Sequence, residues 1–221
     1  MSHRFTDLLD ELKSRLSRMG ALVQQSVEHS VEALIALDTK LAQQVIESDS
    51  KIDEEEVQVE KGAIDLLALH QPAAGDLRLI TTIIKANSDF ERIADCAVNI
   101  AQRVLPLSRH EGYEVPGDLK LMANSVISTL RDTIKAFNLS DEAVARHVLR
   151  GDDVVDALYH QIVQDTLTQM EGEQSAEADV NLANIMIAKN LERIGDHCTN
   201  IAEDVIFVRL GRIVRHLHAV L

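Results

Sequence analysis

Residues 91–101 read ERIADCAVNIA, and residues 192–202 read ERIGDHCTNIA. The two copies lie 101 residues apart, which is longer than one small supersecondary unit. The simplest interpretation is a duplication, in which two homologous halves of the protein each carry the same acidic segment. This repeat therefore bears on both the fold and the function.

A second motif repeats upstream of the first. Residues 49–53 read DSKID and residues 152–156 read DDVVD, 103 residues further along the chain. Asp38 and Asp141 also align at this offset, and both are suited to cap the N-terminus of a helix. Two motifs thus recur in the same order and at nearly the same separation.

The composition and the spacing of apolar residues predict an all-α protein. Aromatic residues make up 3% of the 221 residues and only three prolines occur, which suits long helices better than sheet. Apolar residues recur at spacings of three and four through nearly the whole sequence. We expect six long helices, at about 4–36, 40–68, 76–105, 118–138, 142–170 and 178–208.

The positions of these helices predict two tandem three-helix bundles. Short connections within each half imply up-down-up packing. Proline and glycine are concentrated between Pro106 and Gly117, which marks a linker. We therefore divide the chain into a first bundle at 1–106, a linker at 107–117 and a second bundle at 118–221.

The charge and the apolar pattern restrict the classes of partner. A formal net charge of −14 opposes binding to nucleic acid and to anionic lipid, but would attract cations or basic protein surfaces. The sequence has no apolar signal region and no run of 18 apolar residues, so we expect a cytoplasmic protein without direct membrane insertion. Cys96 and Cys198 fall out of register between the repeats and are better explained as small buried residues than as a disulfide.

The carboxylates of the repeated segment form a stripe on each third helix. Residues four apart on a helix point the same way, so Glu91 lies beside Asp95 and Glu192 beside Asp196. Such pairs repel each other unless an arginine, a lysine or a metal ion lies between them. The stripe flanks the predicted core face, which comprises Phe90, Ile93, Ala94, Ala97, Ile100, Ala101 and Val104.

The upstream motif places acidic residues closer to the core. Asp49 and Asp53 lie inside the apolar arc of the second helix, where an ionised carboxylate is costly unless it is paired. Two helices that each offer two hard oxygen ligands could coordinate Mg²⁺, Mn²⁺, Fe or Ca²⁺, with one site in each half. The alternative is that Arg92 and Arg193 neutralise purely structural acidic stripes. The fourfold occurrence of the spacing favours metal.

Other motifs with chemical meaning are absent. No histidine follows the E-x-x-H pattern of di-iron carboxylate proteins, and no phosphate-binding loop, hydrolase elbow or paired C-x-x-C motif occurs. His197 could add a nitrogen ligand, but it points about 100° away from Asp196 and is better explained as a surface or seam residue. These absences speak against an enzyme.

The two repeated motifs, in two three-helix halves, resemble the PhoU family of bacterial regulators of phosphate uptake. The resemblance covers essentially the whole chain. It implies a negative regulator of the phosphate-starvation response rather than an enzyme. Such a protein would link the cytosolic subunits of a phosphate-specific ABC transporter to a sensor histidine kinase, and it would form a homodimer.

The resemblance also implies divalent or trivalent metal ions on the acidic motifs, with Fe, Mn, Mg and Zn as candidates. The first site would comprise Asp49, Asp53, Glu91 and Asp95, and the second Asp152, Asp156, Glu192 and Asp196. Because Glu203 and Asp204 stand where the first half has Gln102 and Arg103, we expect the second site to hold more or tighter metal. A carboxylate-bridged metalloenzyme and a generic acidic helical adaptor are the alternatives.

Overall fold

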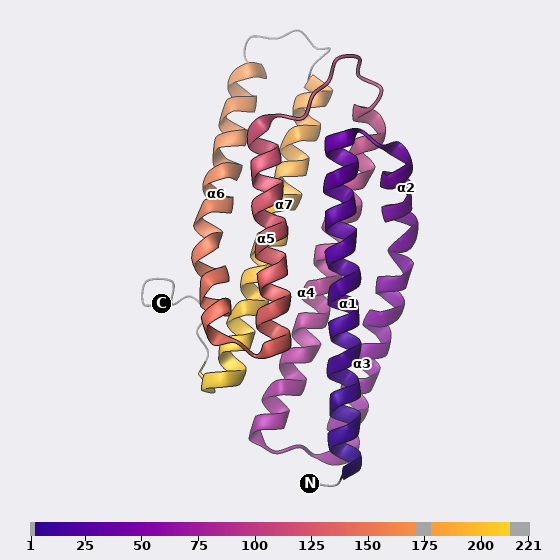
Figure 1. The fold of residues 1–221 in the computed structure, drawn as a ribbon, viewed down its shortest axis with the longest axis vertical. Coiled ribbons are helices and arrows are strands. Elements are labelled where there is room, and N and C mark those ends of the chain that lie inside the picture. The colour runs from indigo at the N-terminus through magenta and orange to yellow at the C-terminus, as the bar shows by residue number, and fades with distance from the viewer. Residues whose placement is uncertain (1–2, 171–177, 213–221) are drawn as a thin grey trace.

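The computed structural model describes residues 3–170 and 178–212, and every regular element in these two ranges is an α-helix (Figure 1). The chain forms two up-down-up halves that stand side by side along a common long axis. The helices are α1 (His3–Ala36), α2 (Thr39–Ser48), α3 (Ser50–His70), α4 (Ala74–Leu107), α5 (Gly117–Leu139), α6 (Glu142–Met170) and α7 (Ala178–Leu210).

The second predicted helix, 40–68, is present as α2 and α3, which are separated only by Asp49. Asp49 keeps right-handed helical angles, with φ −59° and ψ −39°. The hydroxyl group of Ser48 donates to the carbonyl of Val45 at 3.1 Å, and such bonds from serine to its own helix tend to bend it. With α2 and α3 counted as one interrupted helix, the six predicted helices are confirmed.

The turns that precede α2 and α6 are built alike. Asp38 and Asp141 each accept hydrogen bonds from the backbone N–H groups two and three residues further on, at 2.9 to 3.2 Å. The residue before each aspartate adopts a left-handed conformation, with φ 52° at Leu37 and 49° at Ser140. The two predicted N-caps are confirmed, and the turn itself belongs to the repeat.

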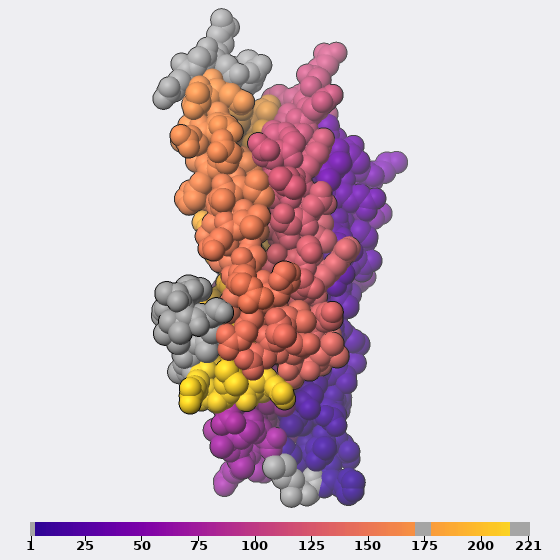
Figure 2. Space-filling view, turned by 60° about the vertical axis from the view of Figure 1, so that its left-hand side comes forward, coloured from indigo at the N-terminus to yellow at the C-terminus, as the bar shows by residue number. Residues whose placement is uncertain are grey.

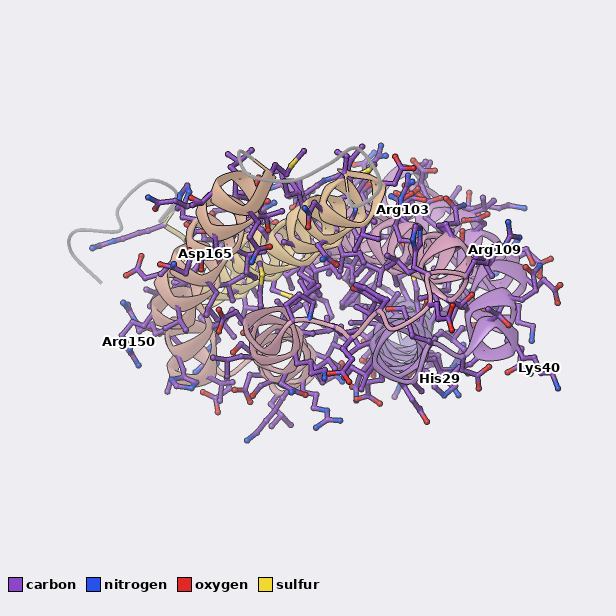
Figure 3. All side chains as sticks on the ribbon, turned by 90° about the horizontal axis from the view of Figure 1, so that it is seen from above. His29, Lys40, Arg103, Arg109, Arg150 and Asp165 are labelled. Atoms are coloured by element: carbon purple, nitrogen blue, oxygen red, sulfur yellow. The ribbon has the colours of Figure 1, made fainter. Side chains whose placement is uncertain are left out.

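Four helices form the centre of the molecule and the others lie outside it. Helices α1, α4, α7 and α5 contact one another in a ring, α2 and α3 pack on α1 and α4, and α6 packs on α5 and α7. The view along the long axis places Lys40 and Arg150 at opposite outer edges (Figure 3). In the space-filling view, α6 covers the outer side of the second half beside α5 (Figure 2).

The two halves share one hydrophobic core rather than two separate ones, because the buried apolar side chains of both belong to a single cluster. The core face predicted for the first motif helix is confirmed, since each of its seven residues is no more than 1% exposed. Those residues are Phe90, Ile93, Ala94, Ala97, Ile100, Ala101 and Val104.

Helices α4 and α7 are antiparallel and carry matched polar contacts along their seam. The side-chain amide of Asn99 donates to Asn190 at 3.3 Å, and that of Asn200 donates to Asp89 at 3.3 Å. These two contacts are equivalent under the 101-residue offset. The two copies of the repeated segment therefore face each other across a local two-fold relation.

The connection between the halves is shorter than the predicted linker, because α4 continues through Pro106 to Leu107 and α5 begins at Gly117. The connection is also held in place, since the hydroxyl group of Tyr113 donates to Asn184 on α7 at 2.6 Å. The predicted division into two domains stays a prediction. Within the described residues, none of the helices combines the length and the apolar character that crossing a membrane requires.

Candidate functional site

The second half brings three of its four predicted carboxylates together. Asp152 and Asp156 lie on α6 and Asp196 lies on α7, and one carboxylate oxygen from each falls within 4.8 Å of the others. Asp152 and Asp156 are partly buried, whereas Asp196 is exposed. Oxygens bound to one divalent cation are at most about 5 Å apart, so this group can close around a single ion.

A glycine on α7 faces this cluster. A Cβ atom at Gly195 would lie 3.4 Å from Cγ1 of Val155 and 3.6 Å from Oδ1 of Asp152, which is ordinary van der Waals contact. The backbone of α7 therefore runs close to α6 beside the carboxylates. The equivalent residue of the first half is Ala94.

The fourth predicted residue, Glu192, is paired with a lysine instead. The ammonium group of Lys189 donates to both carboxylate oxygens of Glu192, at 2.7 and 2.6 Å. The side chain of Glu192 is only 14% exposed. The same ammonium group also lies 5.3 Å from the centre of the Tyr159 ring, a cation–π contact. Glu192 is consequently not a member of the three-carboxylate group.

Burial and neighbouring charges both act on the cluster. Burial raises the pKa of Asp196, and the negative charges of Glu192 and Asp156 raise it further, although Lys189 and His197 oppose the shift. A carboxyl group whose pKa is raised by other carboxylates lies in a region of negative potential. A cation would be stabilised there.

In the first half, Asp49 is the predicted ligand whose pKa is raised most clearly. Burial, together with the charges of Asp53 and Asp95, raises the pKa of Asp49 to about 6. Burial also raises the pKa of Glu91, with Asp95 adding to the shift and Arg92 opposing it. All four predicted residues of the first site are therefore near one another, as the duplication implies.

An arginine supplies positive charge to the acidic stripe of this half. The guanidinium of Arg92 lies 3.4 Å from Glu91 and 3.6 Å from Asp95. Within residues 3–170 and 178–212, the three-carboxylate arrangement occurs only in the second half. Part of the structural alternative, an acidic stripe neutralised by arginine, is thus present in the first half.

One expectation about burial was wrong. Asp53 is exposed, although the helical wheel placed it inside the apolar arc together with Asp49. The buried face of α3 is narrow, since α3 packs only on α1, α4 and a short part of α2, and it is formed by Ile52, Val59, Ala63 and Leu66. Asp53 lies about 100° beyond Ile52 and reaches solvent.

The carboxylates expected to enrich the second site serve a different contact. Asp204 is 3% exposed, and its Oδ1 atom lies 3.2 Å from the ammonium group of Lys85 on α4. Glu203 is 8% exposed, and neither residue belongs to the three-carboxylate group. The prediction that the second site binds metal more tightly stays a prediction, now supported by the clustering itself.

Sequence reasoning missed two sets of contacts. Lys189 was not considered, although its spacing of three from Glu192 on one helix is a recognised ion-pair signal. His197 does lie in a seam, as expected, and its Nδ1 atom is 2.8 Å from Oδ1 of Asp89 on α4. That partner is 108 residues away, and no local pattern indicates it.

The donor set of the second half suits a hard cation. It consists of carboxylate oxygens only, which Mg²⁺, Mn²⁺, Ca²⁺ and iron accept and which softer ions prefer less. The sulfur atoms are not available as ligands, because Cys96 and Cys198 are both buried and burial raises their thiol pKa values to about 11 and about 12. Asp152, Asp156 and Asp196 could hold such an ion. Glu192 could become a further ligand if its ion pair with Lys189 opened.

Comparison with known proteins gives a consistent picture over the full chain. A family model described as "PhoU domain" matches residues 16–104 and 119–205. A phosphate-specific transport system accessory protein PhoU homolog from Pseudomonas putida is 38% identical over 98% of this chain and 85% of its own length. It is named as an accessory protein rather than as an enzyme.

Two solved structures share the fold. The crystal structure of PhoU from Pseudomonas aeruginosa superposes with a TM-score of 0.90 at 37% identity, covering 94% of this chain and all of the other. The phosphate transport system regulatory protein PhoU from Streptococcus pneumoniae gives a TM-score of 0.88 at 28% identity, covering 95% and 99%.

Proposed function

This chain belongs to the PhoU family, and on that premise we propose that it is an accessory, regulatory protein of a phosphate-specific transport system. The observation that carries the proposal is the match of both halves, since the family model covers residues 16–104 and 119–205. The relatives are named for that system and align over 85% and 89% of their own length.

In this proposal the protein works in the cytoplasm, as a homodimer, and holds down the phosphate-starvation response when phosphate is plentiful. It does so by linking the cytosolic subunits of the transporter to a sensor histidine kinase. Long helix faces and a formal net charge of −14 suit it to basic surfaces of such partners. A signal passes only if the protein binds two states of a partner with different affinities.

Metal binding is part of the proposal. A bound metal ion would supply positive charge to the acidic seams. Asp152, Asp156 and Asp196 would hold it in the second half, and Asp49 and Asp95 would contribute most in the first. In each half these residues lie on two neighbouring helices, α6 and α7 in the second half and α2–α3 and α4 in the first. Neutralising their charge would therefore hold the two helices of each pair together. The helix faces offered to partners would then keep one arrangement.

The first test is expression from a phosphate-starvation promoter in phosphate-rich medium. We expect constitutive expression in a clean deletion strain and restored repression when this chain is supplied again. Unchanged repression in the deletion strain would contradict the proposal. A complementing copy that carries Asp49→Asn and Asp152→Asn then asks whether the carboxylates are needed.

A second candidate, an acidic adaptor whose carboxylates are purely structural, is favoured by two contacts. Arg92 already pairs with Glu91 and Asp95, and Lys189 already pairs with Glu192. If the double variant at Asp49 and Asp152 binds the transporter subunits and the kinase as well as the parent protein does, the adaptor is the better description. Loss of binding that parallels loss of metal supports the first proposal.

A further inference from the structure

The carboxylate cluster of the second half has a built-in competitor for one of its ligands. Three aspartates supply oxygens within 4.8 Å of one another, yet the neighbouring Glu192 is turned to Lys189. Both oxygens of Glu192 are bonded, so no oxygen of this carboxylate is left without a positive partner. Lys189 therefore competes with any cation that would take Glu192 as a fourth carboxylate ligand.

The lysine is held in place by more than one contact. Its ammonium group is 2.6 Å from Glu192 and 5.3 Å from the Tyr159 ring on α6. The hydrogen bond to Glu192 raises the pKa of Lys189. At the same time its side chain is 47% exposed, which leaves it free to swing into solvent when a stronger cation arrives.

The first half has no equivalent. The residue at the matching position is Ser88, and the residue that matches Tyr159 is Glu56. Arg92 supplies positive charge there from the opposite side of the stripe, at 3.4 and 3.6 Å. The lysine is therefore a feature of one half only, the half whose aspartates are already clustered.

We infer that Lys189 sets the metal affinity of the second site by competing with the metal ion for Glu192. This inference rests on the proposed metal sites and deepens them. When the cluster is empty, Lys189 neutralises Glu192. When a divalent cation binds, Glu192 joins the three aspartates and Lys189 is released toward solvent. A cation must therefore displace Lys189 before it can bind Glu192, and a weakly binding cation such as Mg²⁺ does so less readily.

The size of the effect follows from the ion pair that must be broken. Hydrogen bonds to a charged group contribute more to binding than neutral ones, whereas ion pairs exposed to solvent contribute little. Glu192 is buried on one side and Lys189 is half exposed. We therefore expect removal of the lysine charge to tighten Mn²⁺ binding roughly three- to tenfold.

The experiment is a calorimetric titration of the full chain with Mn²⁺, in the Asp49→Asn background so that the second half dominates the signal. The variant is Lys189→Gln. The matched control is Lys85→Gln, because Lys85 also pairs with a carboxylate, Asp204 at 3.2 Å, and also lies over an aromatic ring, Phe207 at 5.8 Å. Tighter binding in Lys189→Gln but not in Lys85→Gln is the expected result.

Three results overturn the inference, and they are distinguishable. Equal affinity of the parent and Lys189→Gln would show that the lysine does not compete, while the metal site itself stands. If Lys189→Gln and Lys85→Gln tightened Mn²⁺ binding equally, the effect would come from the change in net charge and not from competition for Glu192. No Mn²⁺ binding by any variant would remove the metal site and the inference together. Adding Glu192→Gln provides a further check, since the effect of Lys189→Gln should then largely disappear.

Discussion

The two halves begin from the same motifs but neutralise their carboxylates differently. In the second half three aspartates cluster and a lysine holds the glutamate, whereas in the first half Arg92 bridges the glutamate and one aspartate. In the first half, burial and the charges of Asp53 and Asp95 also raise the pKa of Asp49 to about 6. The comparison shows that a duplicated ligand set is not a duplicated site, because Lys189, which pairs with Glu192 in the second half, stands where the first half has Ser88.

The largest expected effect concerns metal binding. We expect Asp152→Asn with Asp156→Asn to weaken Mn²⁺ binding at the second half by at least about 100-fold, because two of three clustered ligands are lost. The matched change in the first half, Asp49→Asn with Asp53→Asn, should cost less total binding. Titration of the chelator-treated protein measures both.

Anomalous scattering from crystals soaked in the metal would locate the ions directly. We expect higher occupancy beside Asp196 than beside Asp95. Equal or greater occupancy at the first half would contradict the ranking and would mean that Arg92 moves aside readily.

The next effect compares how the core is packed within each half. A Cβ atom at Gly20 would lie 3.3 Å from Cζ of the Phe90 ring, and the matching positions of the second half are Ala123 and Leu191. Phe90→Leu should reduce the free energy of unfolding by about 1–2 kcal/mol, because the ring is 1% exposed and its loss leaves a cavity. Adding Gly20→Ala should recover part of it.

Urea unfolding of the two single variants and the double variant measures this coupling. Strictly additive changes would show that glycine and phenylalanine are not a complementary pair. Recovery in the double variant would show that the first half can adopt the packing of the second.

A smaller effect depends on pH. The native pKa of Asp49, about 6, exceeds its ordinary value of 3.8, so the folded state binds the proton more tightly than the unfolded state. The free energy of unfolding therefore decreases as the pH rises from about 4 to about 6. In the presence of a chelator, Asp49→Asn should stabilise the protein by about 1 kcal/mol at pH 7.5, after allowance for solvent screening.

The same substitution should change little at pH 4, where the carboxyl group is protonated in the folded protein. Asp53→Asn serves as the control, since this neighbour is exposed and should give a smaller gain. A gain from Asp49→Asn that is equally large at both pH values would contradict the electrostatic explanation.

The smallest effect makes the second half more like the first. Gly195→Ala places an alanine where the first half has Ala94. Its Cβ atom would lie 3.4 Å from Cγ1 of Val155 and 3.6 Å from Oδ1 of Asp152, which are ordinary contacts. We expect up to about 1 kcal/mol of stabilisation, because glycine in the middle of a helix is unfavourable relative to alanine. Thermal unfolding measures the gain, and a loss of stability would indicate that α6 and α7 need the closer approach.

Much of the fold was predictable because its signals are local. The helices follow from apolar periodicity, and the caps at Asp38 and Asp141 follow from residue type and from the repeat. The seven residues predicted for the buried face of α4 are all buried. The interruption at Asp49 was not predicted, since no proline or glycine lies near it to indicate a break.

The sequence by itself determined the duplication, the helical class, the core face between Phe90 and Val104 and the eight candidate carboxylates, because spacing along one helix decides which side chains share a face. Only the tertiary structure decided which carboxylates of α6 and α7 meet, that Asp204 pairs with Lys85 of α4, and that Asp53 reaches solvent. The physical reason is that these contacts join different helices or depend on the width of a buried face. Periodicity along one helix carries no information about the charge on its neighbour.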